Sequence, residues 1–317
     1  MRQPRSSYRH DSSFRPTQDH ERDFGLVPLR FLRSPTAART PVICRTTSTH
    51  FNLWDGLRRC MALPDEQLRF MNPPPFVTRV YPELDFGGFS RLDCSVPFLA
   101  RAQAMALAAT TILEVGCGRG QGNEDASEFR RSLRDFRAPG RRVLGIDVDP
   151  VAASNPWLDE FRRIGPDFRW PVEDGSVDFA FSDYVLEHVE DPAAYFAELR
   201  RVLKPGGTFL ARTPCRNSYI AIAARLIPNA LHARVLGRTQ LGRKEEDVFP
   251  TVYRANTRRA LMRQLGQAGF ETVVYAVEGE PWYMQFSSWL FRIMNVVHPL
   301  LPSFLRSTLI VMARKTR

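Results

Sequence analysis

The residues best suited to chemistry lie in the stretch Thr111–Gly122, which reads TILEVGCGRGQG. A short apolar run that contains one acid, Glu114, leads into glycine at every second position from 116 to 122. Glycine accepts a positive φ and has no Cβ, so alternating glycines let bare backbone approach a bulky ligand. A second apolar run, VLGIDVDP, follows and contains another acid, Asp147, at its end. Strand, glycine turn, helix, strand and acid together predict a nucleotide-binding α/β unit.

The spacing of the glycines limits which nucleotide this unit can hold. The dinucleotide fingerprint needs glycine at its first, third and sixth positions. Counted from Gly116 the sixth position is Gln121, and counted from Gly118 it is Asn123. Both counts fail, which argues against a nicotinamide-dependent oxidoreductase.

Alternating strands and helices must position the two acids. We expect strands at Ile112–Val115, Val143–Val148, Val177–Ser182 and Thr208–Arg212, and helices at Val96–Ala109, from Ser127 to Pro139, and at Ala193–Leu203. This alternation predicts a doubly wound parallel sheet, because parallel strands need crossover helices. The segment 155–168 is expected to be helical or irregular. After the helix Thr257–Ala268, strands at Glu271–Ala276 and Leu309–Ala313 are expected to end the sheet with an antiparallel edge.

Four blocks of this sequence resemble the class I S-adenosylmethionine-dependent methyltransferases, in particular the type 11 group. They are ILEVGCGRG at 112–120, VLGIDVDP at 143–150, WPVEDGSVDFAFSDYVLEHVEDP at 170–192 and LRRVLKPGGTFLARTP at 199–214. The resemblance implies a Rossmann-like α/β fold, doubly wound, with a seven-stranded sheet whose last strand is antiparallel. It also implies S-adenosyl-L-methionine as the cofactor and methyl transfer as the activity.

The resemblance assigns cofactor contacts residue by residue. The turn Gly116–Gly120 would pass under the methionine part, and Glu114 would help to hold its amino group. Asp147 would accept hydrogen bonds from both ribose hydroxyls, because a carboxylate has two acceptor oxygens. The complete predicted set is Glu114, Gly116, Cys117, Gly118, Gly120, Asp147, Val148, Trp170, Ser182 and Asp183.

Two parts of this assignment depart from the family pattern. The interval between Gly120 and Asp147 is longer than the resemblance leads us to expect, so NEDASEF is predicted to form an inserted turn. Many members also place an Asp two residues ahead of a Leu-Pro pair to bind adenine, whereas here Asp167 lies three residues ahead of Trp170. We therefore expect Trp170 or a neighbour to border the adenine, with stacking by the tryptophan as one alternative.

Methyl transfer needs an acceptor held in line with the methyl group and, for a hydroxyl acceptor, a base. His188 follows the predicted strand Val177–Ser182 and is the candidate base, with packing or helix capping as the alternative role. Asn217 and Tyr219 follow the next strand and are candidate acceptor contacts. No metal cluster is expected.

Composition and charge divide the chain into a tail and a domain. The net charge is +10 over 317 residues, and nearly all of the cations are Arg. Residues 1–60 are rich in Arg, Ser, Thr and Pro, and we expect a basic, disordered tail there. Residues 61–317 are expected to form the methyltransferase domain, with a cofactor-binding core at 96–214 and substrate or lid elements at 63–95 and 215–305.

The surroundings of the core offer two candidate substrate elements. The loop Asp85–Ser90 holds two aromatics and two glycines, and it could fold over a ligand or be an ordinary loop. Arg130, Arg134 and Arg137 share one helical face, which is either a solvated face or an anion-binding stripe.

The apolar residues at 281–305 would form a helical core or lid, or contact a membrane peripherally, since Arg292 and His298 argue against a span. The five scattered cysteines and the absence of an apolar leader are typical of a cytoplasmic protein. Methyl transfer to a small-molecule, lipid-linked or glycan acceptor, at oxygen, is the predicted function. The alternatives are a nucleic-acid methyltransferase that uses the Arg-rich tail and a non-catalytic regulatory protein that binds the cofactor.

Overall fold

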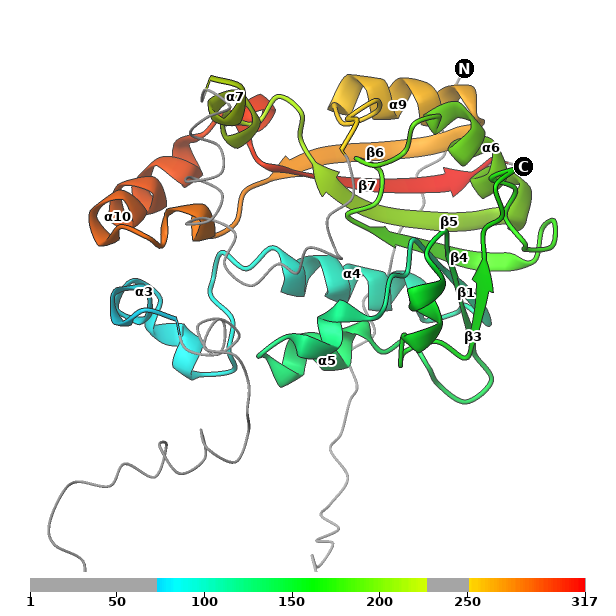
Figure 1. Ribbon diagram of the computed structural model, residues 1–317, viewed down its shortest axis with the longest axis horizontal. Helices are drawn as coiled ribbons and strands as arrows, with labels where there is room; N and C mark the ends of the chain where they lie inside the picture. The colour runs from blue at the N-terminus through cyan, green and yellow to red at the C-terminus, as the bar shows by residue number, and fades with distance from the viewer. Residues whose placement is uncertain (1–72, 227–250, 317) are drawn as a thin grey trace, which may run out of the picture. The chain divides into compact units, whose positions relative to one another are not determined.

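The computed structural model describes residues 73–226 and 251–316. Its centre is a seven-stranded sheet in the order β3-β2-β1-β4-β5-β7-β6 (Figure 1). The strands are β1 Thr111–Val115, β2 Arg142–Asp147, β3 Glu160–Arg163, β4 Val177–Asp183, β5 Leu203–Pro214, β6 Phe270–Val277 and β7 Thr308–Lys315. β7 pairs antiparallel with both β5 and β6, and the pairs among β1 to β5 are parallel. The predicted fold class is confirmed; the predicted disordered tail 1–60 lies outside the described residues.

β3 is the strand that the residues themselves did not reveal. The segment 155–168 was expected to be helical or irregular, but Glu160–Arg163 pairs in parallel with β2. Its sequence, EFRR, has a single apolar residue, and none of its four residues is buried. A short edge strand of this kind depends on its neighbour's backbone groups and carries no apolar periodicity.

Helices cover both faces of the sheet. Their bounds are α3 Pro75–Val80, α4 Ser95–Ala106, α5 Glu128–Arg134, α6 Pro192–Val202, α7 Tyr219–Leu226, α9 Arg258–Gln267 and α10 Ser288–Val297. Short 3₁₀ turns are η1 Pro82–Asp85, η2 Gln121–Glu124, η3 Pro150–Ser154, η5 Trp282–Met284, η6 His298–Leu300 and η7 Ser303–Leu305. The hydroxyl of Ser127 caps α5 by accepting from the Arg130 backbone N–H at 3.3 Å, as expected. α5 ends earlier than predicted, at Arg134.

Strand alternation divides the core into two apolar layers. Phe179 and Phe181 of β4 pack with α4 residues such as Phe98, whereas Ala180 belongs to the layer that contains Phe196 of α6. Both faces of β4 are thus buried, which explains why central strands read as continuous apolar runs. The side chain of a residue at the end of a strand is directed by this same alternation.

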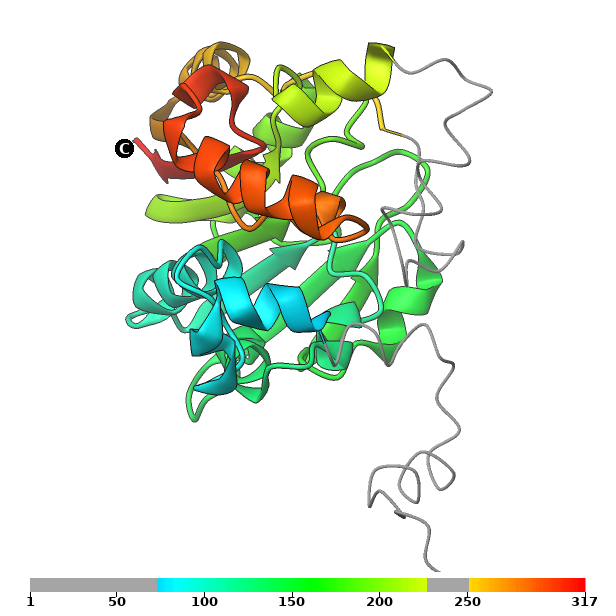
Figure 2. The ribbon, with the colours of Figure 1, turned by 90° about the vertical axis from the view of Figure 1, so that its left-hand side faces the viewer.

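α3, α7 and α10 lie beyond the carboxyl ends of the parallel strands (Figures 1 and 2). The fully buried ring of Phe291 on α10 packs edge-on against Phe76 and Tyr81, with centroids at 5.5 and 5.9 Å. Among the described residues, no helix is long and apolar enough to cross a membrane.

Shortening Phe179 to Ala should lower the free energy of unfolding by about 3–5 kcal/mol, because the ring is fully buried at the centre of the sheet. Val273→Ala on the edge strand β6, where the side chain is 56% exposed, should change it by about 0.5 kcal/mol or less. Denaturant unfolding measures both changes; equal shifts in the two variants would contradict the described core.

Candidate functional site

The glycine turn after β1 is packed at both ends and open in its middle. Gly116, Gly118 and Gly120 have φ values of +69°, +51° and +77°. A Cβ on Gly116 would lie 2.4 Å from a methyl of Val185, and one on Gly120 would lie 2.7 Å from Cδ of Pro156. A Cβ on Gly118 would meet no atom within 4 Å. The space above Gly118 is therefore where a ligand can approach the backbone.

Asp147 and Asn155 hold this turn in place. The Gly118 N–H donates to Oδ2 of Asp147 at 2.8 Å, and the Asp149 N–H donates to Oδ1 at 2.9 Å. Nδ2 of Asn155 donates to the carbonyl oxygen of Cys117 at 2.9 Å. Each carboxylate oxygen accepts more than one hydrogen bond, so Asp147 keeps capacity for ligand hydroxyls. Asn155 was missed by the sequence analysis because a single Asn in a turn has no distinguishing pattern.

Glu114 lies on the same sheet face as Asp183, since it pairs with Phe181, and the surrounding protein excludes much of the water around its partly exposed side chain. Burial raises the pKa of Glu114 to about 8, and the negative charges of Asp183 and Asp147 raise it further, while Arg134 opposes them. The carboxyl group is thus poised to ionise when a cation approaches, since an opposite charge favours the charged form.

A buried network of side-chain ion pairs lies at the carboxyl ends of β4 and β5. Asp183 accepts hydrogen bonds from Nε and Nη2 of Arg212, the latter at 3.0 Å, and from Nη1 of Arg134 at 3.2 Å. The guanidinium of Arg212 lies between the rings of Phe98 and Tyr184, at 4.8 and 4.9 Å from their centroids. Although burial opposes ionisation, these two cations lower the pKa of Asp183. Asp183 is therefore a fixed negative charge at this edge of the sheet.

Two details of this network point to a ligand. Tyr184, which directly follows Asp183, has a φ of +58°, an uncommon backbone conformation that clusters at functional sites. Nε of Arg134 is buried without a hydrogen-bond partner in the described part of the chain, and the same side chain packs on Gly122. Arg130, its neighbour on the predicted helical face, forms ion pairs with Asp125 and Asp93.

The other predicted cofactor residues are placed differently. Val148 is exposed beside Asp147. The thiol of Cys117 is buried, and its sulfur lies 2.8 Å from where a Cβ on Gly145 would stand. Ser182 is fully buried on the face opposite Asp183, and Trp170 is buried edge-on against Tyr195 at 5.1 Å. The structure thus packs the side chains of Cys117, Ser182 and Trp170 into the protein, and their predicted cofactor contacts stay predictions.

The candidate acceptor residues lie on the segments that follow β4 and β5. His188 lies beside Glu187, with 3.9 Å between Nε2 and Oε1. Asn217 is exposed, and the Tyr219 hydroxyl lies 2.7 Å from Nε2 of the buried His298. Nδ1 of His298 lies 2.8 Å from the Gly279 carbonyl, which can only accept, so Nδ1 carries the hydrogen and Nε2 accepts from Tyr219.

The loop Asp85–Ser90 is attached to α5. The Gly87 and Gly88 carbonyls accept hydrogen bonds from Ser127 and Arg130, and the ring of Phe89 packs against Phe129 at 5.5 Å. Phe86 is 85% exposed at the tip. The loop therefore stands beside α5 with one aromatic ring directed to solvent.

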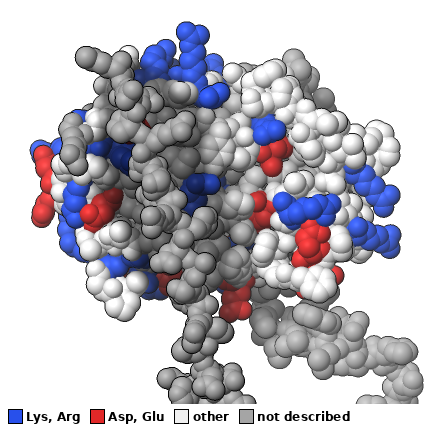
Figure 3. Space-filling view, turned by 180° about the vertical axis from the view of Figure 1, so that it is seen from behind, with Lys and Arg blue, Asp and Glu red and all other residues white. Residues whose placement is uncertain are grey.

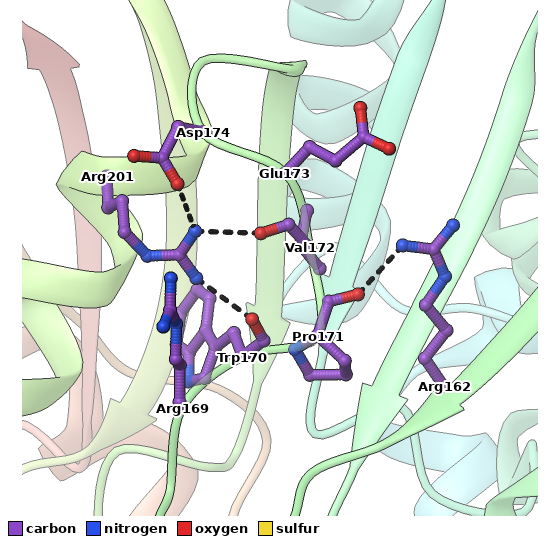
Figure 4. Close-up of a pocket in the computed structure, with 8 residues that line it drawn as sticks. All are labelled: Arg162, Arg169, Trp170, Pro171, Val172, Glu173, Asp174 and Arg201. Carbon is purple, nitrogen blue, oxygen red and sulfur yellow. Dashed lines mark hydrogen bonds and ion pairs between the residues drawn. The ribbon is translucent and has the colours of Figure 1, made fainter.

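A surface hollow of about 420 Å³ lies elsewhere, along the loop that leads into the amino end of β4 (Figure 4). Arg201 crosses it and donates to the carbonyls of Trp170 and Val172 and to Asp174. Arg162 donates to the Pro171 carbonyl from the other side. Arg162, Arg201 and Asp174 are thus bonded to other groups that line the hollow, which lies at the opposite end of β4 from Asp183.

Charge on the rear face of the molecule is mixed. Figure 3 shows Lys and Arg side chains interspersed with Asp and Glu among the atoms that it colours. The described residues therefore do not present a single basic patch on that face.

Comparison with known proteins gives further evidence for the family of this chain. A family model described as a methyltransferase domain matches residues 113–211. A "Probable S-adenosylmethionine-dependent methyltransferase" of Mycolicibacterium smegmatis is 32% identical over 184 residues, which cover 54% of this chain and 66% of that protein. A ubiquinone biosynthesis O-methyltransferase of Xanthomonas campestris pv. campestris is 31% identical over 147 residues, 41% of this chain and 57% of that protein. The matches thus span between about half and two thirds of these relatives' lengths.

One solved structure is geranyl diphosphate C-methyltransferase from Streptomyces coelicolor A3(2). It superposes with a TM-score of 0.40 at 16% identity, covering 68% of this chain and 80% of that one. The chain described here belongs to the class I S-adenosylmethionine-dependent methyltransferases. Its methyltransferase domain is of the type 11 group, whose cofactor is S-adenosylmethionine. The resemblance and the cofactor predicted from the four sequence blocks are confirmed.

Replacing Asp183 with Ala should lower the free energy of unfolding by about 3–5 kcal/mol, because it leaves the Arg212 guanidinium, whose side chain is 4% exposed, without its counter-charge. Asp135→Ala, which breaks the exposed pair with Arg137, should cost about 1 kcal/mol or less. Denaturant unfolding compares the two variants, and a small effect of Asp183→Ala would show that the network is not buried in solution.

Proposed function

We propose that this protein transfers the methyl group of S-adenosylmethionine to an oxygen atom of a small-molecule, lipid-linked or glycan acceptor. The observation that carries the proposal is the glycine turn, open above Gly118 and bordered by the carboxylates of Glu114 and Asp147. The site lies where the sheet order reverses between β1 and β4, the position at which open α/β sheets bind ligands.

Each part of the cofactor has a partner of suitable chemistry in this proposal. Asp147 accepts from the ribose hydroxyls, and Glu114 holds the ammonium group of the methionine part. The free Nε–H of Arg134 is a donor for the methionine carboxylate, because a guanidinium recognises carboxylates well. Backbone at Gly118 approaches the ligand, because no protein atom fills the space beside this residue and it has no Cβ of its own.

The cofactor supplies a methyl group on a positively charged sulfur, so the protein contributes position more than bond chemistry. Asp183 is a fixed anion near that sulfur, and Val148, Cys117, Ser182 and Trp170 complete the proposed cofactor set. His188 is the proposed acceptor of the hydroxyl proton, while Asn217 and Tyr219 orient the acceptor. Residues 96–214 thus form the cofactor core, and the segments 63–95 and 215–305 form the substrate elements.

Relatives support oxygen as the atom that receives the methyl group. The Xanthomonas relative is named a ubiquinone biosynthesis O-methyltransferase. A malonyl-[acyl-carrier protein] O-methyltransferase of Hahella chejuensis is 31% identical over 107 residues. In this proposal the acceptor contacts come mainly from segments outside residues 113–211, the part that matches the family model.

Asp147→Ala should weaken binding of S-adenosylhomocysteine by about a hundredfold, since a carboxylate that accepts two ligand hydrogen bonds is lost. Asp135→Ala, an exposed acid outside the site, should bind as the wild type does. Titration calorimetry measures both affinities. Methyl-labelled cofactor and metabolite extracts then test turnover; binding that is unaffected by Asp147→Ala would overturn the proposed cofactor site.

Binding should also release a proton near neutral pH. The raised pKa of Glu114, about 8, keeps its carboxyl protonated in the free protein, and an arriving ammonium group favours ionisation. The affinity of the wild type for S-adenosylhomocysteine should therefore rise as the pH increases from about 6 toward 8. Calorimetry in buffers of different ionisation heat counts the proton. Glu114→Gln should abolish the release, while the exposed Glu173→Gln keeps it; release by both variants would contradict this role of Glu114.

A further inference from the structure

Helix α10 is covered on one face and carries exposed apolar residues on the opposite face. Phe291, Asn295 and His298 form the inner face at helical spacing. Phe291 packs on Tyr81, Asn295 accepts a hydrogen bond from the Tyr81 hydroxyl, and His298 accepts from Tyr219. On the opposite side, Trp289 and Val296 are 70% and 67% exposed. An apolar helix face is normally buried against another element.

The exposed side continues beyond the helix. The exposed apolar residues of this region are Phe286, Trp289, Ile293, Val296, Leu300 and Phe304. We call them together the outer α10 surface. Within α10, positions 289, 293 and 296 follow the i, i+4, i+7 spacing of one helical face. Figure 2 shows α10 on the near side of the molecule, with no other described helix or strand in front of it. Exposed apolar residues that share one helical face are typical of an interaction site.

The segment that carries this surface contains no acid. From Pro281 to Leu305 the sequence has no Asp or Glu, and its one Lys or Arg is Arg292. Arg292 lies on α10 itself and is exposed. The side chains of Arg and Trp combine an apolar body with a polar end, which suits the boundary between water and hydrocarbon. An acid-free aromatic surface with an exposed cation is complementary to a layer of anionic head groups.

We infer that the outer α10 surface binds the surface of an anionic lipid bilayer, with α10 lying in the plane of the interface. Trp289, Val296 and their neighbours enter the boundary between head groups and acyl chains, and Arg292 remains among the head groups. This inference stands on the exposed face and its charge, so it does not require the proposed cofactor contacts. Because α10 lies beyond the carboxyl ends of the strands, membrane contact would also bring lipid-linked molecules to the proposed acceptor side (Figure 1).

The test is flotation of the full chain with vesicles of phosphatidylcholine, with and without an equal part of phosphatidylglycerol. The wild type should float with the anionic vesicles, and Trp289→Ser combined with Val296→Ser should lower the bound fraction at least about tenfold. Arg292→Gln should weaken binding to anionic vesicles and reduce its salt dependence. A matched control is Leu107→Ser combined with Val273→Ser, two exposed apolar residues on other elements, which should bind as the wild type does.

Residues 1–60 are the same in every variant, so the attraction of their arginines to anionic lipid cannot produce a difference between variants. Two further measurements complete the test. Affinity for S-adenosylhomocysteine should be unchanged in the α10 double variant, which shows a folded protein and separates this test from that of the cofactor site. Equal flotation of the double variant and the control would overturn the inference. Sedimentation velocity can also overturn it. If the wild type is a dimer and the α10 double variant is a monomer, the outer α10 surface is a contact between two copies of the chain.

Discussion

The site depends on one constraint, that the chain leaving β1 must turn across the sheet edge without side chains in its way. Three positive φ values at Gly116, Gly118 and Gly120 make this turn possible. Val185 and Pro156 pack so closely on its ends that a Cβ there would collide with them. The hydrogen bond from Gly118 to Asp147 then joins the end of β1 to the end of β2. This hydrogen bond thus fixes both the open backbone at Gly118 and the carboxylate of Asp147.

The buried network around Asp183 is the second constraint, and it acts on the neighbouring strands. Asp183 of β4 pairs with Arg212 of β5 and with Arg134 at the end of α5. Charges held in a poorly solvated place fix one another's positions strongly, because separation would leave each without compensation. The same negative charge helps to raise the pKa of Glu114, so the network influences a neighbouring group that it does not contact through a hydrogen bond. Fixed charge and a poised carboxyl are what a cationic cofactor requires.

The proposed acceptor side is built differently from the proposed cofactor side. Its connections join segments distant in sequence: Tyr81 with Asn295, and Tyr219 with His298. A change in α10 can therefore alter the surroundings of Tyr219 without touching the glycine turn.

The sequence by itself determined the sheet, the family and the cofactor, because their signals are local: apolar runs, alternating glycines and an acid at the end of a strand. It could not find β3, since four residues with a single apolar side chain have no periodicity and pair only because β2 offers its edge. Tertiary structure alone decided that Ser182 and Trp170 face the core, that Arg134 is paired with Asp183, and that Tyr219 meets His298. Direction and partnership of side chains depend on which segments pack together, and that is a property of the folded chain.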